Sequence, residues 1–162
     1  MKILIAYGTK TGTTQVCVEK IKEALIGQEV DVVNLEKHHR IHLENYDAIV
    51  VGSPLYMGQI RSKVSQFLIH NKKQLVETKM HLFACGLARG QEGIELLRKQ
   101  VPSELFGHAI QIAQLGGEVH VERLSFPYRW IMKKVMAESK PELGFLDQEI
   151  NLFAQNILNQ VK

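Results

Sequence analysis

The sequence predicts an α/β protein built on a doubly wound parallel sheet with helices on both faces. Short apolar runs, typical of buried strands, alternate along the chain with stretches whose apolar residues recur every three or four positions, as on one face of a helix. Strands that alternate with helices imply right-handed crossovers and therefore parallel strands. The chain has 162 residues, of which 45% are hydrophobic and 23% charged, which suits one globular domain. We therefore expect a single domain over residues 1–162.

The first half of the chain is expected to contribute three strands and two helices. The strands cover residues 2–7, 30–34 and 47–53, and a polar, His-rich connection separates the second strand from the third. The third strand enters a turn at Pro54, and the first helix ends at Gly27. The apolar face of the first helix is marked by Cys17, Val18, Ile21, Ala24 and Leu25, and that of the second by Ile60, Val64, Phe67 and Leu68.

The second half adds two strands and two helices. Residues 80–85 form an apolar run that is halted by Gly86, and residues 109–113 form the fifth strand. Between these runs, Ile94, Leu97 and Val101 predict a third helix. The last helix has the most regular pattern, since one face is held for about four turns by Leu146, Ile150, Phe153, Ala154, Ile157, Leu158 and Val161. This helix is expected to pack firmly on the sheet.

Composition argues against several classes of function. The net charge is +3, from 20 basic and 17 acidic residues, which is too small to indicate nucleic acid as a partner. Cys17 and Cys85 form neither a Cys-x-x-Cys pair nor a metal-ligand spacing, so we expect two buried thiols. His38, His39 and His42 have no carboxylate or cysteine at a known ligand spacing and are interpreted as a solvated loop, which predicts no metal site. No histidine forms a recognisable triad with a nucleophile.

Three polar loops follow the first, third and fourth expected strands, at residues 8–14, 52–58 and 86–90. Because such sheets bind ligands at the carboxyl ends of their strands, these loops are expected to converge on one crevice. The first loop has four threonines and two glycines and leads into a helix, so N–H groups, hydroxyls and the helix dipole can face one phosphate. It matches neither the triphosphate loop Gly-x-x-x-x-Gly-Lys-[Ser/Thr] nor the dinucleotide fingerprint Gly-x-Gly-x-x-Gly. The alternative is a Thr-rich turn that caps the helix without a ligand.

The first two loops carry a family resemblance. Residues 9–14, Thr-Lys-Thr-Gly-Thr-Thr, resemble the flavodoxin phosphate loop [Ser/Thr]-x-Thr-Gly-x-Thr, and residues 53–56, Ser-Pro-Leu-Tyr, resemble the flavodoxin loop that flanks the isoalloxazine ring. The resemblance implies a flavodoxin-like five-stranded sheet of order 2-1-3-4-5 that holds FMN noncovalently. The phosphate contacts that it implies are Thr9, Thr11, Gly12, Thr13 and Thr14, with Lys10 as a backbone contact. The contacts to the ring are Ser53, Pro54, Leu55, Tyr56, Met57 and Gly58 in the first loop, and Cys85, Gly86, Leu87, Ala88, Arg89 and Gly90 in the second.

Two features set this chain apart from electron-carrier flavodoxins, which are usually acidic and stack aromatic side chains on the flavin. This chain is basic, and its second loop has no aromatic residue but has Arg89. A guanidinium close to the ring would favour the anionic reduced flavin by charge attraction, so we hypothesise that Arg89 raises the reduction potential and favours two-electron chemistry. The alternative is a solvated arginine on the surface.

Residues 128–136 form a candidate basic amphipathic helix. If the segment is helical, Tyr128, Ile131, Met132, Val135 and Met136 share an apolar face, and Arg129, Lys133 and Lys134 crowd the other side. Such a helix suits a membrane surface or an acidic partner, and the alternative is that it covers the sheet edge. No stretch of the sequence approaches the roughly 20 apolar residues of a membrane span, and the start of the chain is too short and strand-like for a signal peptide. We therefore expect a cytoplasmic protein, and the membrane alternative for this helix adds peripheral contact to the inner face of the membrane.

This segment also resembles the menaquinone-dependent protoporphyrinogen oxidase branch of the flavodoxin superfamily, which has a Tyr-Arg-Trp sequence followed by a Met- and Lys-rich stretch. The resemblance implies an FMN oxidoreductase that oxidises protoporphyrinogen IX to protoporphyrin IX in haem synthesis and passes electrons to membrane quinone. A carrier flavodoxin that shuttles electrons between redox partner proteins is the alternative. A third possibility is a flavodoxin-fold regulator without flavin, although a receiver domain is disfavoured because Ser53 stands where its phosphorylated aspartate would end the third strand.

Overall fold

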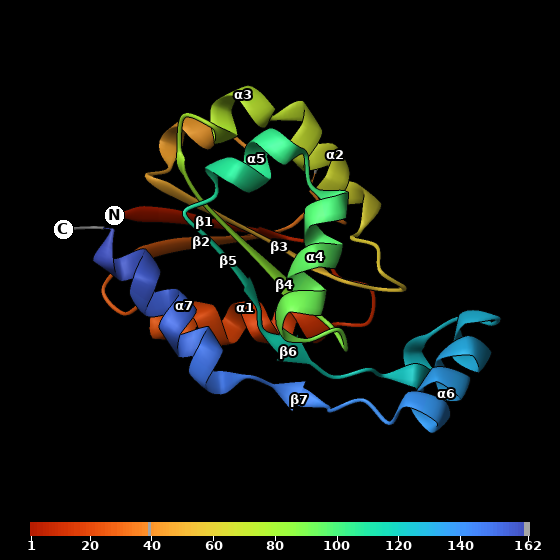
Figure 1. Ribbon diagram of the computed structural model, residues 1–162. Coiled ribbons are helices and arrows are strands. Elements are labelled where there is room, and N and C mark those ends of the chain that lie inside the picture. Colours follow the sequence, from red (N-terminus) through yellow and green to blue (C-terminus); the bar gives the residue numbers. More distant parts are fainter. Residues whose placement is uncertain (39, 161–162) are drawn as a thin grey trace.

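The computed structural model describes residues 1–38 and 40–160, and its centre is a five-stranded parallel sheet (Figure 1). In sheet order the strands are β2 (Glu29–Asn34), β1 (Lys2–Tyr7), β3 (Ala48–Pro54), β4 (Lys79–Cys85) and β5 (Gln111–Gln114). Each neighbouring pair is parallel, and Ile5 of β1 lies opposite Val32 on one side and Val50 on the other. The predicted fold class and strand order are confirmed.

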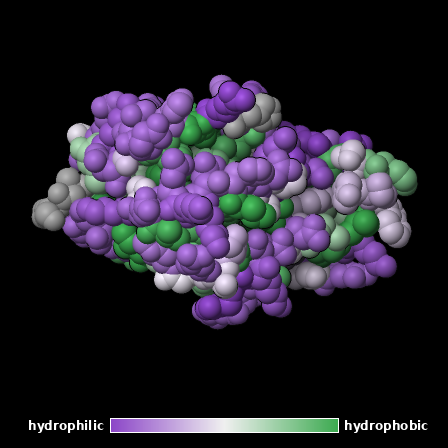
Figure 2. All heavy atoms as spheres, turned by 90° about the horizontal axis from the view of Figure 1, so that it is seen from above, coloured by the Kyte–Doolittle hydropathy of each residue, from purple (hydrophilic) through white to green (hydrophobic). Residues whose placement is uncertain are grey.

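Helices cover both faces of this sheet (Figure 1). One face packs against α1 (Thr13–Ala24) and α7 (Asp147–Asn159), and the other against α2 (Ser62–His70), α3 (Lys72–Leu75), α4 (Gly90–Gln100) and α5 (Ser103–His108). Side chains of β1 alternate between the two layers, since Ile3 and Ile5 face α1 and α7 while Leu4 and Ala6 face the other helices. All four are fully buried, as expected for a parallel strand covered on both faces. The outer surface of the α2–α5 layer is largely hydrophilic (Figure 2).

Several boundaries differ from the sequence prediction. The structure adds α3, α5 and the short 3-10 turn η1 (Leu43–Asn45). Val101, expected within the third helix, lies just after α4, because the following Pro102 cannot donate a backbone hydrogen bond and a new helix begins beyond it. The fifth strand begins at Gln111, two residues later than expected, since α5 and its end extend to Ala109. His39 and Val161 lie outside the described residues.

Between β5 and α7 the chain makes an excursion beside the carboxyl ends of the strands (Figure 1). Its base is an antiparallel pair formed by β6 (Gly116–Gly117) and β7 (Gly144–Phe145). Residues 118–143, which we call the insert, contain the 3-10 turn η2 (Val121–Arg123) and the helix α6 (Tyr128–Ser139). The helix expected at residues 128–136 is therefore present. It stands beside the strand ends instead of covering the sheet edge, and the sequence did not predict the β6–β7 pair at its base.

Candidate functional site

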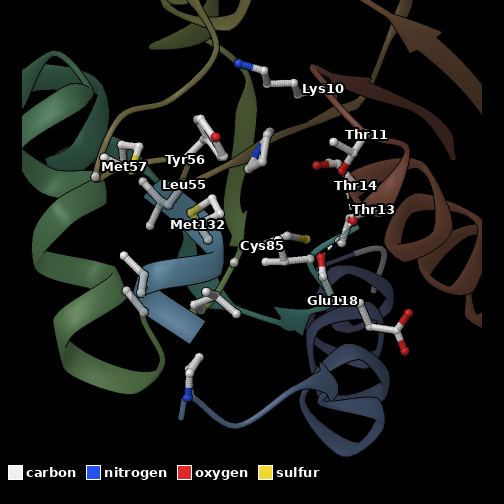
Figure 3. Close-up of a pocket in the computed structure, with 18 of the residues that line it drawn as sticks. Lys10, Thr11, Thr13, Thr14, Leu55, Tyr56, Met57, Cys85, Glu118 and Met132 are labelled. Carbon is white, nitrogen blue, oxygen red and sulfur yellow. Dashed lines mark hydrogen bonds between the residues drawn. The ribbon is translucent and has the colours of Figure 1, made fainter. Parts of the chain in front are cut away.

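The carboxyl ends of β1, β3 and β4 surround a cavity of about 340 Å³ (Figure 3). This volume lies in the range of small-molecule pockets. The wall comes from the phosphate loop at residues 9–14, the loops after β3 and β4, the start of α4, and the insert. The predicted site residues that line it are Thr9, Lys10, Thr11, Thr13, Thr14, Pro54, Leu55, Tyr56, Met57, Gly58, Cys85, Gly86, Leu87 and Ala88. Gly12, Ser53, Arg89 and Gly90 belong to the same loops without lining the cavity.

The phosphate loop turns sharply into α1. Gly12 has φ 94°, in the left-handed region that favours glycine, and its N–H donates to Thr9 Oγ1 at 3.0 Å. Helix α1 starts at the next residue, so the free N–H groups of its first turn and the positive end of its dipole lie at the cavity. No carboxylate stands in that first turn. The loop therefore presents a positive, donor-rich surface suited to an anion.

One hydroxyl of this loop has no partner. Thr14 is fully buried and lines the cavity, and its Oγ1 makes no hydrogen bond to any described residue. A buried polar group without a partner costs about 1–3 kcal/mol, and native proteins keep few of them. A phosphate oxygen in the cavity would accept a hydrogen bond from Thr14. The residues present therefore fit a phosphate group.

The loop after β3 is held in place from behind. Ser53 Oγ accepts the N–H of Arg61 at 2.9 Å and donates to the carbonyl oxygen of Pro54 at 3.0 Å. The N–H of Leu55 donates to the carbonyl oxygen of Cys85 at 2.7 Å, which joins this loop to the end of β4. Ser53 thus positions the wall instead of forming part of it.

Away from the phosphate loop the cavity becomes apolar. Its lining side chains there come from the two loops, α4 and the insert, and they are Leu55, Leu87, Leu96, Leu124, Met132 and Val135. Glu92 and Glu118 also border the cavity, and the Glu118 carboxylate points away from the labelled loop residues in Figure 3. A flat, largely apolar ring system fits this part of the cavity.

Arg89 is directed away from the cavity. Its Nη2 donates to the carbonyl oxygen of Gly144 at 2.7 Å, and its Nη1 lies 3.6 Å from the Glu142 carboxylate. Its side chain is only 20% exposed, which is a correction to the alternative of a solvated arginine. The guanidinium holds the end of the insert against the loop after β4. An influence of Arg89 on a bound flavin stays a prediction.

Lys10 joins the phosphate loop to the insert. Its Nζ lies 4.5 Å from the ring centroid of Tyr56 and 4.3 Å from that of Tyr128, and the two rings meet edge to face at 5.8 Å. Each such cation–π contact contributes about 0.5–2 kcal/mol. Burial raises the pKa of Tyr56, whose hydroxyl is also without a partner among the described residues. The sequence implied a backbone contact for Lys10, and the structure adds this role for its side chain.

Sequence reasoning missed the insert as a wall of the site. The lining residues that it did not name are Glu92 and Leu96 of α4, and Glu118, Val119, Leu124, Met132, Val135, Ser139 and Pro141 of the insert or its borders. The apolar spacing of Met132 and Val135 was the available signal, since it marks a face that must be covered. The docking contact itself, in which Thr13 Oγ1 donates to the carbonyl oxygen of Glu118 at 2.9 Å, spans 105 residues and leaves no local pattern.

The remaining features to consider are the two cysteines, a metal site and a membrane-spanning helix. Cys17 and Cys85 are buried and unbridged, as predicted, and both a hydrogen bond with Cys17 and burial raise the pKa of Cys85 well above its usual value. Cys85 therefore borders the cavity as a neutral thiol. Within residues 1–38 and 40–160, no group of three or more His, Cys, Asp or Glu side chains could hold a metal ion. Across the same residues, no helix combines the length and apolar character needed to cross a membrane.

A family model described as a flavodoxin domain matches residues 4–143. Among curated proteins, protoporphyrinogen IX dehydrogenase [quinone] of Escherichia coli strain K12 is 30% identical over 70 residues. This match covers 42% of the chain, and it spans only 39% of the relative's length.

Similar solved structures match between 69% and 100% of the chain at low identity. A flavodoxin of Fusobacterium nucleatum bound to flavin mononucleotide has a TM-score of 0.55 and 14% identity, with 98% of each chain covered. A short-chain flavodoxin associated with a bacterial microcompartment has a TM-score of 0.64 and 12% identity, with 100% of this chain and 99% of that one covered. The two-electron reduced flavodoxin of Megasphaera elsdenii has a TM-score of 0.55 and 21% identity, over 69% of this chain and 84% of that one. These likenesses support the fold.

Proposed function

The chain belongs to the flavodoxin domain family, and we propose that it is an FMN-dependent oxidoreductase that takes electrons from a protoporphyrinogen and passes them to a quinone. The observation that supports FMN as the cofactor is the uneven lining of one cavity. This cavity has a donor-rich loop at one end and apolar walls at the other. FMN has a phosphate at one end and a flat ring system at the other. The unpartnered Thr14 hydroxyl supports a phosphate oxygen at the loop end of the cavity.

Different loops hold the two ends of this cofactor. The phosphate loop and the first turn of α1 bind the phosphate through backbone N–H groups and hydroxyls. Leu55 and Tyr56 of the first ring loop and Leu87 of the second border the space for the ring. When bound, FMN accepts a hydride or electrons itself, and the protein supplies position and electrostatics. We assign no side chain as a general acid or base.

The insert favours an enzyme over an electron carrier. Leu124, Met132 and Val135 add an apolar wall to the cavity from a segment that follows the last strand of the sheet. Such a wall excludes water and gives an apolar substrate a surface beside the ring. The partial likeness to the dehydrogenase of Escherichia coli supports the same reading.

The charge of the insert suits a substrate with carboxylates. Arg129, Lys133, Lys134 and Lys140 are all exposed on α6 or at its end, close to the side chains that line the cavity. Clustered cations raise the local concentration of anionic ligands and speed their arrival. The propionate groups of a porphyrinogen meet this description.

The exposed surface of α6 suits a lipid surface, where a quinone would be found. Phe126 is 82% exposed and Trp130 62%, and both stand among the same cations. Pale and green side chains gather at the right-hand end of the molecule in Figure 2, where α6 lies. Aromatic side chains flanked by Lys and Arg are typical of peripheral membrane contact. We propose that the protein works at the inner face of the membrane without entering it.

The test is an anaerobic two-step reaction. The purified protein is loaded with FMN, mixed with protoporphyrinogen IX in a stopped-flow instrument, and then mixed with a menaquinone analogue. The proposal expects porphyrinogen to bleach the visible absorbance of the oxidised flavin, and the quinone to restore it. Free FMN and the apoprotein serve as controls. FMN binding without either step, together with a stable one-electron reduced form, would indicate a carrier between partner proteins; no FMN uptake would exclude both.

A further inference from the structure

A cation from the insert is bound to the phosphate loop. Arg123 of η2 donates from Nη1 to the carbonyl oxygen of Thr11 at 2.7 Å, across 112 residues of sequence. The same nitrogen would lie 3.4 Å from a Cβ atom placed on Gly12. Arg123 itself does not line the cavity.

A chain of hydrogen bonds connects this guanidinium to the cavity. Arg123 bonds the carbonyl oxygen of the peptide between Thr11 and Gly12, and the N–H of that same peptide donates to Thr9 Oγ1 at 3.0 Å. The Thr9 hydroxyl accepts this bond and keeps its own hydrogen to donate, and Thr9 lines the cavity. A cation at the carbonyl end polarises the peptide and strengthens each donor further along the chain.

Among the described residues Arg123 makes no close ion pair, although the pKa of Glu122 is lowered by a backbone hydrogen bond, by His120 and, in smaller part, by the charge of Arg123. The two nearest carboxylates in sequence, Glu118 and Glu122, lie 3.8 Å and 3.4 Å from the ring nitrogens of His120. No ion pair joins Arg123 to a carboxylate in the part of the chain that the structure describes. The loop's own cation, Lys10, is held between two aromatic rings. A phosphate monoester carries about −1.5 to −2 charges near pH 7, which the neutral N–H groups and hydroxyls of the loop do not balance.

We propose that Arg123 is the counter-charge for the FMN phosphate, acting from the insert through the Thr11–Gly12 peptide and Thr9. It is a positioning residue, because it polarises the donors that touch the phosphate. Since the bond between Arg123 and Thr11 also fastens the insert to the loop, phosphate binding and docking of the insert reinforce each other. The inference rests on the proposed binding of FMN.

The test compares FMN with riboflavin, which has the same ring and no phosphate. Dissociation constants of both flavins are measured by fluorescence quenching for the wild type, Arg123→Gln, Arg123→Lys and the control Arg129→Gln. Arg129 is matched because it also lies in the insert and donates to backbone carbonyls there, those of Glu122 and Leu124, without touching the phosphate loop. Arg123→Gln should weaken FMN about tenfold, equal to about 1.4 kcal/mol, and riboflavin less than about twofold. Arg123→Lys should recover part of the FMN affinity.

The control separates charge from structure. Arg129→Gln should change the two dissociation constants by nearly the same factor, since it removes an insert cation that makes no bond to the phosphate loop. A loss of equal size for both flavins in Arg123→Gln, or no loss for FMN, would overturn the inference. If Arg123→Gln does not fold, Arg123→Lys gives the same comparison, because it keeps the charge but moves it away from the Thr11 carbonyl and must therefore weaken FMN more than riboflavin. Failure of the wild type to bind either flavin would instead reject the proposed function.

Discussion

Thr14 and His81 are both fully buried polar residues whose side chains make no hydrogen bond to any described residue. Their surroundings give the two groups different consequences. Thr14 faces the cavity, where a ligand can satisfy its hydroxyl. His81 stands in the middle of β4 with its ring edge to face against Phe153 of α7, so no ligand reaches it. The unpartnered Thr14 hydroxyl lowers the stability of the protein until a ligand binds, and the buried His81 makes the fold sensitive to acid.

Replacement of Thr14 by valine should move stability and affinity in opposite directions. Valine has nearly the same shape and no hydroxyl, so the apoprotein should gain about 1 kcal/mol in free energy of unfolding once the unpartnered group is gone. FMN affinity should fall about 10- to 100-fold, because a hydrogen bond to a charged group is lost. Urea unfolding and flavin titration measure the two effects. An apoprotein that is destabilised while FMN affinity stays unchanged would show that Thr14 is only a packing residue.

Acid should destabilise the fold through His81. Burial, helped by the charge of Lys79, lowers the pKa of His81 from 6.5 to about 4, so the folded protein binds this proton less readily than the unfolded chain. The free energy of unfolding is therefore unaffected by protonation of His81 above pH 6.5, and it decreases as the pH falls from 6.5 towards 4. The loss amounts to about 3 kcal/mol over that window.

Comparison of two leucine variants isolates this effect. His81→Leu should unfold with a smaller decrease in free energy than the wild type between pH 7 and pH 4.5, as measured by urea denaturation. His70 is exposed on α2, and His70→Leu should retain the wild-type pH dependence. Parallel pH profiles for the wild type and His81→Leu would contradict the assignment.

Single residues of the site were predictable where a local motif fixes them. The spacing of threonines and Gly12 placed the phosphate loop, because the turn and the helix start that it needs lie within six residues. The direction of Arg89 was not predictable. Its partners, Gly144 and Glu142, follow it by more than 50 residues and belong to a segment whose path is set by tertiary contacts.

At the scale of elements, the formation of α6 was predictable from local spacing, but the position where it packs was not. The three-four spacing of Met132 and Val135 predicted a helix with one apolar face. It did not show what would cover that face, because α6 packs at a cavity formed by loops that lie about 40 or more residues earlier in the sequence. The pair β6–β7 was missed because it has two residues per strand, three of the four being glycine.

Arg89 should stabilise the docked position of the whole insert. Arg89→Gln removes a charge-assisted bond to Gly144 and the contact with Glu142, which together hold the end of the insert. Limited proteolysis should then cut residues 118–143 about tenfold faster, since loss of about 1.5 kcal/mol raises the population of the open form by that factor. Arg98 pairs with Glu95 inside α4, so Arg98→Gln should digest like the wild type.

The same variant tests the earlier hypothesis for this residue. If Arg89 also favours the anionic reduced flavin, the midpoint potential of Arg89→Gln should fall below that of the wild type. Faster cleavage with an unchanged potential would remove Arg89 from flavin tuning and leave its structural role.

For the whole molecule, the sequence predicted the sheet well because every level of the pattern agreed. Buried strands, amphipathic helices and loop residues all favour one doubly wound arrangement, and the five strands occupy the expected order. The insert departs from that pattern and carries both the cavity wall and the exposed aromatic side chains. Exposure of those side chains depends on how the whole chain folds, so only the structure shows that Phe126 and Trp130, more than the predicted apolar face, point outward.

This orientation predicts membrane contact through one end of the molecule. Phe126→Glu and Trp130→Glu should each weaken binding to vesicles of anionic phospholipid by about tenfold, because each removes an exposed aromatic side chain that would enter the lipid and adds a charge that the lipid repels. Ile26 provides a matched control: it is also 82% exposed, and it lies between α1 and the start of β2, at the amino ends of the strands and far from the insert. Ile26→Glu should therefore bind like the wild type in a vesicle sedimentation assay. Equal losses in all three variants would mean that net charge alone governs binding, and no binding by the wild type would place the quinone step away from the membrane.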